Sequence, residues 1–280
     1  FCDEDQLMYI PAGRNLLAVI PESFTKGIKS GQEHEATDLE IDIRQIDWIT
    51  QEFIQSIREM KSQFGGRLEE ITENYLKTVK GQIRNHDVEL ACNLIRDILK
   101  ADYVCDKDGE KLFYDKEHWV KLMFGSSGQQ EIVWALNSIF LTILKNEKTF
   151  IVFEEPESHL FPDSQLVLAE LAALTVNSSK SRIIITTHSP YILTAMNLLL
   201  YSGEKEGKQN SEKDVIRKEY RLKPQKVKAY LLSRNTGKLE SITGEEIGLV
   251  DAMKIDGVSD KIDDAMDRIL QNSMRKQEKV

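Results

Sequence analysis

The chain has 280 residues, of which 41% are hydrophobic, enough for one large domain with an insertion or for two modest domains. Its formal net charge of −9 argues against a wholly basic nucleic-acid coat, although a local basic patch could still contact DNA. The three cysteines have no paired spacing, and no apolar run is long enough to span a membrane, so we expect a cytoplasmic protein in a reducing compartment. Because the sequence opens on Phe1 and has no signal-peptide layout, we expect that it begins inside a longer gene product.

Residues 8–17 begin as a short apolar segment. Pro11 and Gly13 predict a turn in it, and Arg14 follows this turn. One interpretation of Arg14 is an ion pair at the surface or between domains. The sequence leaves open whether Arg14 instead reaches a ligand.

Residues 38–100 carry apolar side chains at helical spacings of three and four. A first stripe at residues 46–64 ends at Gly65 and Gly66, and a second stripe covers residues 68–83. This pattern predicts two amphipathic helices in an antiparallel hairpin, followed by a third helix near residues 88–99. The stripes could simply pack on neighbouring structure, or the hairpin could act as a lid or as a docking platform for a partner.

Residues 103–114 predict a β-hairpin around an Asp-Lys-Asp-Gly turn at residues 106–109. A Ca²⁺ loop is the sharper alternative, but the later ligands of an EF-hand are missing from the sequence. Residues 119–124 then lead to the next turn.

A turn rich in serine and glutamine, residues 125–130, opens a long apolar helix that we predict at residues 132–144. We interpret Ser127 as the N-cap, with Gln130 three residues later at capping-box spacing. The free amides and the dipole of such a helix start form an anion site. A simple helix cap without any ligand is the alternative interpretation of Ser127.

An apolar strand is predicted at residues 149–153, and it ends in two adjacent carboxylates, Glu154 and Glu155. A run without alternation is typical of a parallel-sheet strand that is buried on both faces. Carboxylates at the edge of a core need a compensating partner, for which hydrated Mg²⁺ is a natural choice. Because ligands of open α/β sheets bind beyond the carboxyl ends of the strands, we expect both glutamates to lie at a nucleotide site.

A second buried strand is predicted at residues 182–187, and His188 follows it. Ser189 is expected to cap a helix at residues 190–201, with Pro190 at its first position. This arrangement would present His188 at the same edge as the two glutamates, although an ordinary edge histidine is the alternative.

Residues 228–242 predict a strand, a turn and a strand, and residues 247–270 predict one or two helices.

These motifs together resemble the ATP-binding-cassette (ABC) type ATPase heads of the SMC-like and overcoming-lysogenization-defect (OLD) group. Residues 126–130 are similar to the signature motif, and residues 150–155 are similar to Walker B with its catalytic glutamate. Residues 156–162 are similar to the D-loop stretch, and residues 187–189 are similar to the switch-histidine motif. Four motifs in family order form a specific signal.

The resemblance implies an α/β P-loop NTPase fold, an ABC ATPase head with a mostly parallel sheet flanked by helices and a helical insertion. We expect residues 1–32 to end the N-terminal part of the head and residues 33–100 to form the insertion or lid. Residues 101–245 would carry the four motifs, and residues 246–280 would form C-terminal helices and a tail.

The resemblance also implies roles for individual residues, with ATP and Mg²⁺ as cofactors. Glu155 would orient the attacking water, His188 would bond the γ-phosphate, and Glu154 would hold Mg²⁺ through water. The signature-like residues would cap ATP bound by the opposite head, and two further residues would line the dimer seam. The signature set is Ser126, Ser127, Gly128, Gln129 and Gln130, and the seam pair is Glu157 and His159.

Two features depart from the pattern of this class. No Walker A loop is present, because neither Gly-Lys pair, at residues 207–208 and 237–238, is followed by serine or threonine. The phosphate loop is therefore expected before Phe1 or on another chain, and the ATPase site is expected to be incomplete in this chain. Glu154 stands where the class usually has aspartate, and its extra methylene moves the carboxylate by roughly 1.5 Å.

The function that the resemblance implies is an ATP-binding and ATP-hydrolysing switch, with ATP sandwiched between heads of a homodimer or higher homo-oligomer. By family analogy, its state would control a separate effector, a nuclease or toxin, in bacterial anti-phage defence. A non-hydrolysing scaffold that docks a nuclease or toxin is the alternative. A fused OLD-type nuclease is less favoured, because the residues after His188 contain no convincing Glu plus Asp-x-Asp set.

Overall fold

The computed structural model describes residues 6–14, 48–79, 85–204, 215–233, 236–244, 248–252, 265, 266 and 268. The chain divides into two compact units, Phe1–Thr187 and His188–Val280. In the parts of the chain that the structure describes, no helix is both long enough and apolar enough to cross a membrane. The domain boundaries expected from the sequence stay a prediction.

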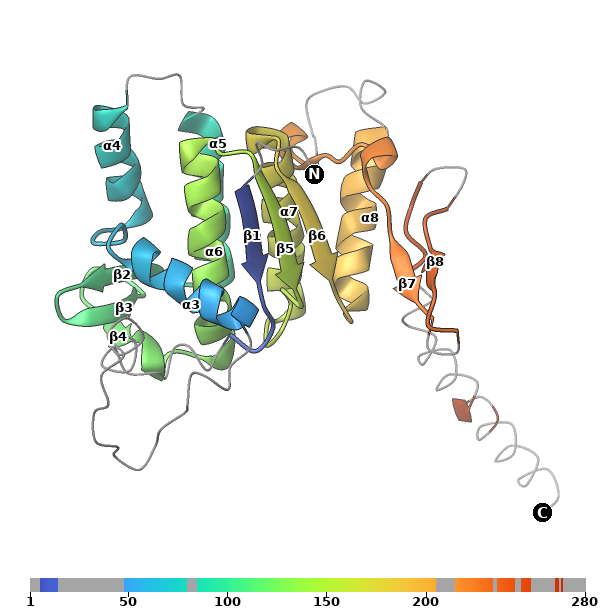
Figure 1. Ribbon diagram of the computed structural model, residues 1–280, viewed down its shortest axis with the longest axis horizontal. Coiled ribbons are helices and arrows are strands. Elements are labelled where there is room, and N and C mark those ends of the chain that lie inside the picture. Colours follow the sequence, from blue (N-terminus) through green and yellow to red (C-terminus); the bar gives the residue numbers. More distant parts are fainter. Residues whose placement is uncertain are drawn as a thin grey trace, which may run out of the picture. The chain divides into compact units, whose positions relative to one another are not determined.

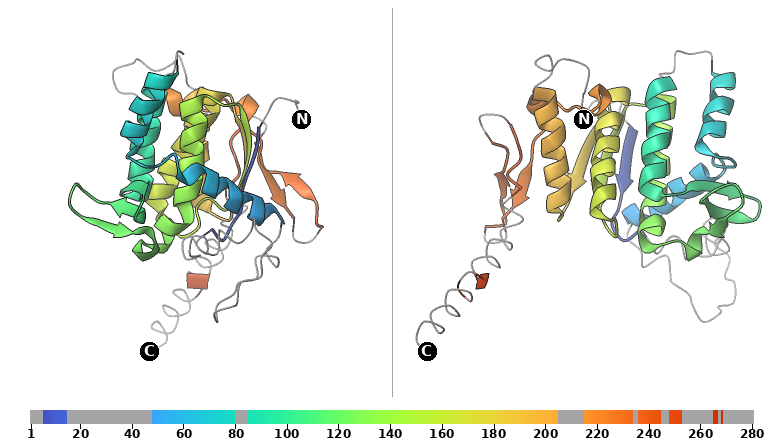
Figure 2. Two further views of the ribbon diagram at one scale, coloured as in Figure 1. Left: turned by 60° about the vertical axis from the view of Figure 1, so that its left-hand side comes forward. Right: turned by 180° about the vertical axis from the view of Figure 1, so that it is seen from behind.

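The first unit is built on a parallel sheet of three strands, in the order β1 (Gln6–Ile10), β5 (Thr149–Glu154) and β6 (Arg182–Thr186). Helix α7 (Pro162–Ser179) connects β5 to β6 and lies across one face of the sheet (Figures 1 and 2). Two adjacent parallel strands require such a crossover. The predicted α/β fold, a parallel sheet flanked by helices, is confirmed.

Strands β5 and β6 are less buried than the sequence predicts. Phe153 is buried on β5, whereas the neighbouring Val152 is only half-buried. On β6, Ile184 is 49% exposed. The prediction that both strands are buried on both faces is therefore wrong, because α7 covers only one of the two faces of the sheet.

Helix α6 (Ser127–Lys145) is the centre of the core of this unit, because all residues from 131 to 144 are buried. It packs against α5 (Asn85–Leu99) and α7. A helix that is apolar on all sides belongs inside a core. The helix ends at Asn146, whose φ of 53° is the left-handed conformation common after a helix.

Helices α3 (Trp48–Lys61), α4 (Leu68–Thr78) and α5 confirm the three predicted helices within the described residues, and the segment between α3 and α4 contains the two glycines. The predicted antiparallel hairpin of the first two helices is wrong. Helix α4 lies beside α5, whereas α3 lies against β1 and α6, where the Ser138 hydroxyl reaches the sulfur of Met60 (Figure 1). The apolar stripe of α3 identifies its buried face but not the element that buries it.

The predicted β-hairpin is confirmed and belongs to an antiparallel sheet of β2 (Asp102–Asp106), β3 (Gly109–Phe113) and the unpredicted β4 (Trp119–Lys121). Next to the hairpin turn, Nζ of Lys111 in β3 lies 2.7 Å from Asp106 Oδ2 and 3.4 Å from Asp108 Oδ2. The hydrogen bond from Lys111 holds the pKa of Asp106 below its usual value. A lysine compensates these carboxylates, so the turn gives no support to the Ca²⁺ alternative.

Cys92 on α5 is predicted to be an unreactive thiol. Its side chain is buried, and this burial, assisted by the negative charge of Glu69, raises the pKa of Cys92 to about 12. An unfolded thiol ionises near pH 8.5, roughly. The buried neutral thiol therefore stabilises the fold fully below that pH, and this contribution is lost as the pH rises toward 12. At pH 8, roughly the thiol's unfolded pKa, we expect iodoacetamide to modify Cys92 only after urea unfolds the protein, as measured by mass spectrometry.

Cys105 on β2 is the internal control, because it is also a free thiol but is only half-buried. It should be modified before Cys92 in the folded protein. Equal rates for the two thiols would contradict the predicted protection of Cys92.

The second unit begins with helix α8 (Pro190–Glu204), whose N-cap is Ser189, as predicted. The Ser189 hydroxyl accepts hydrogen bonds from the backbone N–H groups of Tyr191 and Ile192, at 3.1 and 3.4 Å. The side-chain amide of Asn197 binds both backbone groups of Val250 at 2.7 Å and so ties a later segment to α8.

The predicted strand, turn and strand are confirmed as β7 (Tyr230–Leu232) and β8 (Leu239–Ser241), which pair antiparallel. The 3₁₀ turns η5 (Lys218–Tyr220) and η6 (Pro224–Lys226) precede them. The helices predicted at residues 247–270 lie largely outside the described residues.

Candidate functional site

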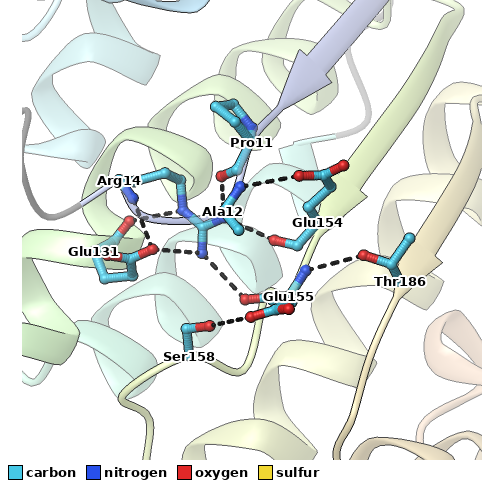
Figure 3. A network of polar contacts seen from close by, with 8 residues as sticks. All are labelled: Pro11, Ala12, Arg14, Glu131, Glu154, Glu155, Ser158 and Thr186. Carbon is cyan, nitrogen blue, oxygen red and sulfur yellow. Dashed lines mark hydrogen bonds and ion pairs between the residues drawn. The ribbon is translucent and has the colours of Figure 1, made fainter. Parts of the chain in front are cut away.

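The candidate site lies at the edge of the sheet where all three parallel strands end. Ile10 stands opposite Phe153, and Glu154 stands opposite Thr186, so the carboxyl ends of the strands meet there. The loops that follow β1 and β5 bring Pro11, Ala12 and Arg14 together with Glu155 and Ser158 (Figure 3). In open α/β sheets this is the edge at which ligands bind.

Glu154 is the last residue of β5, and its side chain is half-buried. Its Oε2 accepts a hydrogen bond of 3.3 Å from the backbone N–H of Ala12. This contact comes from the loop after β1, so the neighbouring strand helps to fix the direction of the carboxylate. The structure thus places Glu154 at the predicted edge, and its role as a metal ligand stays a prediction.

Glu155 has a φ of 40°, an unusual backbone conformation for a residue with a side chain. Its N–H donates to the backbone oxygen of Thr186 at 2.9 Å and also lies 3.3 Å from Thr186 Oγ1. The Ser158 hydroxyl donates to Glu155 Oε2 at 3.4 Å. A strained residue persists only where its surroundings hold it, and such residues cluster at functional sites. The half-buried carboxylate of Glu155 is therefore held in a defined place at the strand end.

Arg14 is the residue whose importance the sequence did not reveal. It is 1% exposed and lies within 3.5 Å of Glu131 Oε1 in α6, so the ion pair is present but is buried inside the first unit, not at the surface or between domains. Nη1 donates to the carbonyl of Glu154 at 2.8 Å, and Nη2 donates to that of Glu155 at 3.3 Å (Figure 3). The sequence showed an arginine just after a Pro-Gly turn, and this gave no indication of these carbonyl partners.

Burial lowers the pKa of Arg14 from its ordinary value, while nearby carboxylates oppose that shift, chiefly Glu131 and then Glu157, Glu155 and Glu154. Arginine stays protonated in proteins. The site therefore contains a buried positive charge behind its carboxylates.

The signature-like turn is capped one residue earlier than predicted. The N-cap is Ser126, which forms a capping box with Gln129, whereas Ser127 is the first residue of α6 and is exposed. The side-chain amide of Gln129 donates to the carbonyl of Leu99, and that of Gln130 donates to two carbonyls of the preceding turn. Both glutamines shape the turn, and the hydroxyl of Ser127 lies at its surface.

Gly128 brings the signature-like turn against the loop that follows Glu155. A Cβ atom at Gly128 would lie only 2.6 Å from the backbone oxygen of His159, so only glycine allows this approach. His159 is exposed, with a φ of 62°. In the same loop, Glu157 Oε1 accepts a hydrogen bond of 2.6 Å from Thr187 Oγ1. The structure thus joins two of the predicted motifs, although the place of Glu157 and His159 in a dimer seam stays a prediction.

His188 follows β6 in the sequence, is exposed, and is the first residue of the second unit. Its predicted bond to a γ-phosphate stays a prediction.

The donor set at the strand end fits a divalent cation only together with other ligands. Among the described residues, no group of three or more His, Cys, Asp or Glu side chains could hold a metal ion. Mg²⁺ is commonly bound by one or two carboxylates and completes its shell with waters and substrate phosphates. Glu154 and Glu155 fit this second kind of site.

A family model described as AAA ATPase domain matches residues 15–193. The matched range includes the signature-like turn, both glutamates and His188. A comparison with curated proteins found no match.

Proposed function

Because the chain belongs to the AAA ATPase domain family, we propose that it is an ATP-hydrolysing switch subunit of the ABC and SMC-like type. Family membership indicates nucleotide binding with a divalent metal ion, and ATPase function in general. The proposal adds that two heads hold ATP between them. The observation that supports it most is the pair Glu154 and Glu155 at the carboxyl end of β5, both held by hydrogen bonds. The loop that follows this pair contacts the signature-like turn at Gly128.

Phosphoryl transfer to water depends mostly on positioning and on charge stabilisation. When bound, Mg²⁺ would neutralise charge on the phosphates, and Glu154 would hold it through water. Glu155 would orient the attacking water and accept its proton, a task that requires a carboxylate in a fixed place. The backbone conformation of Glu155 and its bonds to Thr186 support this assignment.

The start of α6 is the proposed contact to ATP held by the opposite head. Ser127 and the first N–H groups of a long helix with its positive dipole end favour phosphate oxygens. Gly128 packs against the carbonyl of His159. A phosphate contact at this turn would therefore also affect the position of the loop after Glu155. Nucleotide would thus link assembly of two heads to the state of the catalytic loop.

The effector is the least direct part of the proposal, because it rests on the resemblance to SMC-like and OLD-group heads. We infer that the ATP state of a homodimer or higher oligomer controls a separate nuclease or toxin, in anti-phage defence.

The test is to measure ATP turnover and molar mass of the full-length gene product, with and without ATP and Mg²⁺. We expect steady ATP hydrolysis and a larger mass when ATP is present, which returns to the starting value as ATP is consumed. A protein that neither hydrolyses ATP nor changes its mass would instead be a scaffold with an ATPase fold.

A further inference from the structure

All three guanidinium nitrogens of Arg14 donate hydrogen bonds inside the first unit. Nε donates to the carbonyl of Glu131 at 3.0 Å, and Nη1 donates to the carbonyls of Pro11 and Glu154. Nη2 donates to the carbonyl of Glu155 and lies 3.5 Å from Glu131 Oε1. The guanidinium also lies over the Phe153 ring, 5.2 Å from its centre. A lysine has three donors on one atom and could not reproduce this planar set.

One side chain therefore joins three segments that are far apart in the sequence. They are the loop after β1, the end of β5 and the first turns of α6, where Glu131 also accepts the backbone N–H of Arg14 at 2.8 Å. The link to β5 falls on the carbonyls of Glu154 and Glu155 rather than on their carboxylates. Arg14 thus holds the backbone of both glutamates, while their side chains keep the separate contacts to Ala12 and Ser158.

The peptide groups on both sides of the Glu155 Cα are fixed by this arrangement. The N–H side is held by Thr186, and the C=O side is held by Arg14. With a φ of 40°, the residue lies outside the broad favoured regions, so loss of one anchor should let it relax. A relaxed backbone would turn the carboxylate away from its place.

We propose that Arg14 is a positioning residue, which fixes the Glu155 carboxylate and ties it through Glu131 to the helix that carries the signature-like turn. This inference rests on the proposed ATPase function for its kinetic consequence. Arg14 acts through the two carbonyls and touches no reacting atom. A misplacement of a catalytic group by about 1 Å can lower a rate by roughly 100-fold.

The test combines Arg14→Lys with Glu155→Gln in the full-length gene product. In the wild-type background, Arg14→Lys is expected to lower kcat by about 10- to 100-fold, with KM for ATP changed by less than about threefold. In the Glu155→Gln background, the same change is expected to lower the residual kcat by less than about twofold, because its target is already lost. Equal losses in both backgrounds, or an unchanged kcat, would overturn the proposal.

Lys111→Met is the matched control, because Lys111 is likewise a buried cation between carboxylates, but it lies in the β2–β3 hairpin. It should lower the melting temperature and leave kcat unchanged.

Glu131→Gln is the second variant, in case Arg14→Lys folds poorly. It keeps an acceptor for the Arg14 N–H, and we expect the same kinetic pattern with a smaller loss.

Hydrogen exchange provides a readout that needs no hydrolysis. Arg14→Lys should speed exchange at the amides of Glu155 and Ser158 relative to Lys111→Met, because the Ser158 N–H donates to the Glu155 carbonyl. If the wild type does not turn over ATP, the proposed function fails, but this comparison still decides the role of Arg14. Exchange that is no faster than in Lys111→Met would overturn the role of Arg14 by itself.

Discussion

Glu155→Gln is expected to slow ATP hydrolysis by roughly 10²- to 10⁴-fold while ATP stays bound. Glutamine has the same length, and the backbone bonds that hold position 155 do not involve the carboxylate. An amide oxygen can still accept the hydrogen bond that the Ser158 hydroxyl donates. What the amide cannot do is accept a proton from water. The change therefore removes the chemical step and preserves the shape of the site.

Single-turnover hydrolysis and the amount of nucleotide retained after gel filtration measure the two parts of this expectation. Because hydrolysis is proposed to release the assembly, the variant should also keep the larger, ATP-bound mass for longer than the wild type. Glu73→Gln on α4 is the control, since it makes the same chemical change at an exposed position. A Glu155→Gln protein that hydrolyses ATP as fast as Glu73→Gln would remove Glu155 from the mechanism.

The central strand and its carboxylates could be predicted because their evidence is local. An apolar run followed by Glu154 and Glu155 identifies a strand and its end without reference to the rest of the chain. The break at Gly65 and Gly66 and the cap at Ser189 are local in the same sense. The parallel sheet was predicted from an apolar run without alternation and from the resemblance, whereas helix α7 between β5 and β6 was not predicted.

The N-cap of α6 was misplaced for a definable reason. Ser126 and Ser127 are each followed three residues later by a glutamine, so both satisfy the capping-box spacing. Which of the two serines is the N-cap depends on which carbonyl groups accept hydrogen bonds from the side-chain amides of Gln129 and Gln130. Gln129 reaches Leu99 in another helix, which is a tertiary contact that the spacing does not contain.

Arg14 could not be assigned for a related reason. Its partners at β5 are backbone carbonyls about 140 positions later in the chain, and any residue type supplies a carbonyl.

The exposure of Ile184 was missed because an apolar run shows that a strand prefers burial but not that a layer covers it. Side-chain patterns thus predicted the elements and the acidic pair, whereas the supports of the site depend on tertiary packing.

Gly128→Ala is expected to destabilise the first unit, even though alanine is the better helix former. Propensity alone would favour alanine by up to about 1 kcal/mol inside a helix. The new Cβ, however, would lie 2.6 Å from the His159 oxygen and 3.4 Å from Leu160 Cδ2. The closer atom belongs to the backbone, so the helix start or the loop must move, and overpacking of this kind costs about 1–3 kcal/mol. We therefore expect a net loss of unfolding free energy, measured by urea denaturation.

The same change should also lower kcat. Displacement of the His159 carbonyl moves a loop whose Ser158 binds Glu155 through both its backbone and its hydroxyl. Gly65→Ala is the matched control, because a Cβ there meets no heavy atom within 4 Å and the glycine has no positive φ. It should leave both stability and kcat near the wild-type values. If Gly128→Ala were as stable and as active as Gly65→Ala, the signature-like turn and the catalytic loop would not be in the close contact on which their coupling depends.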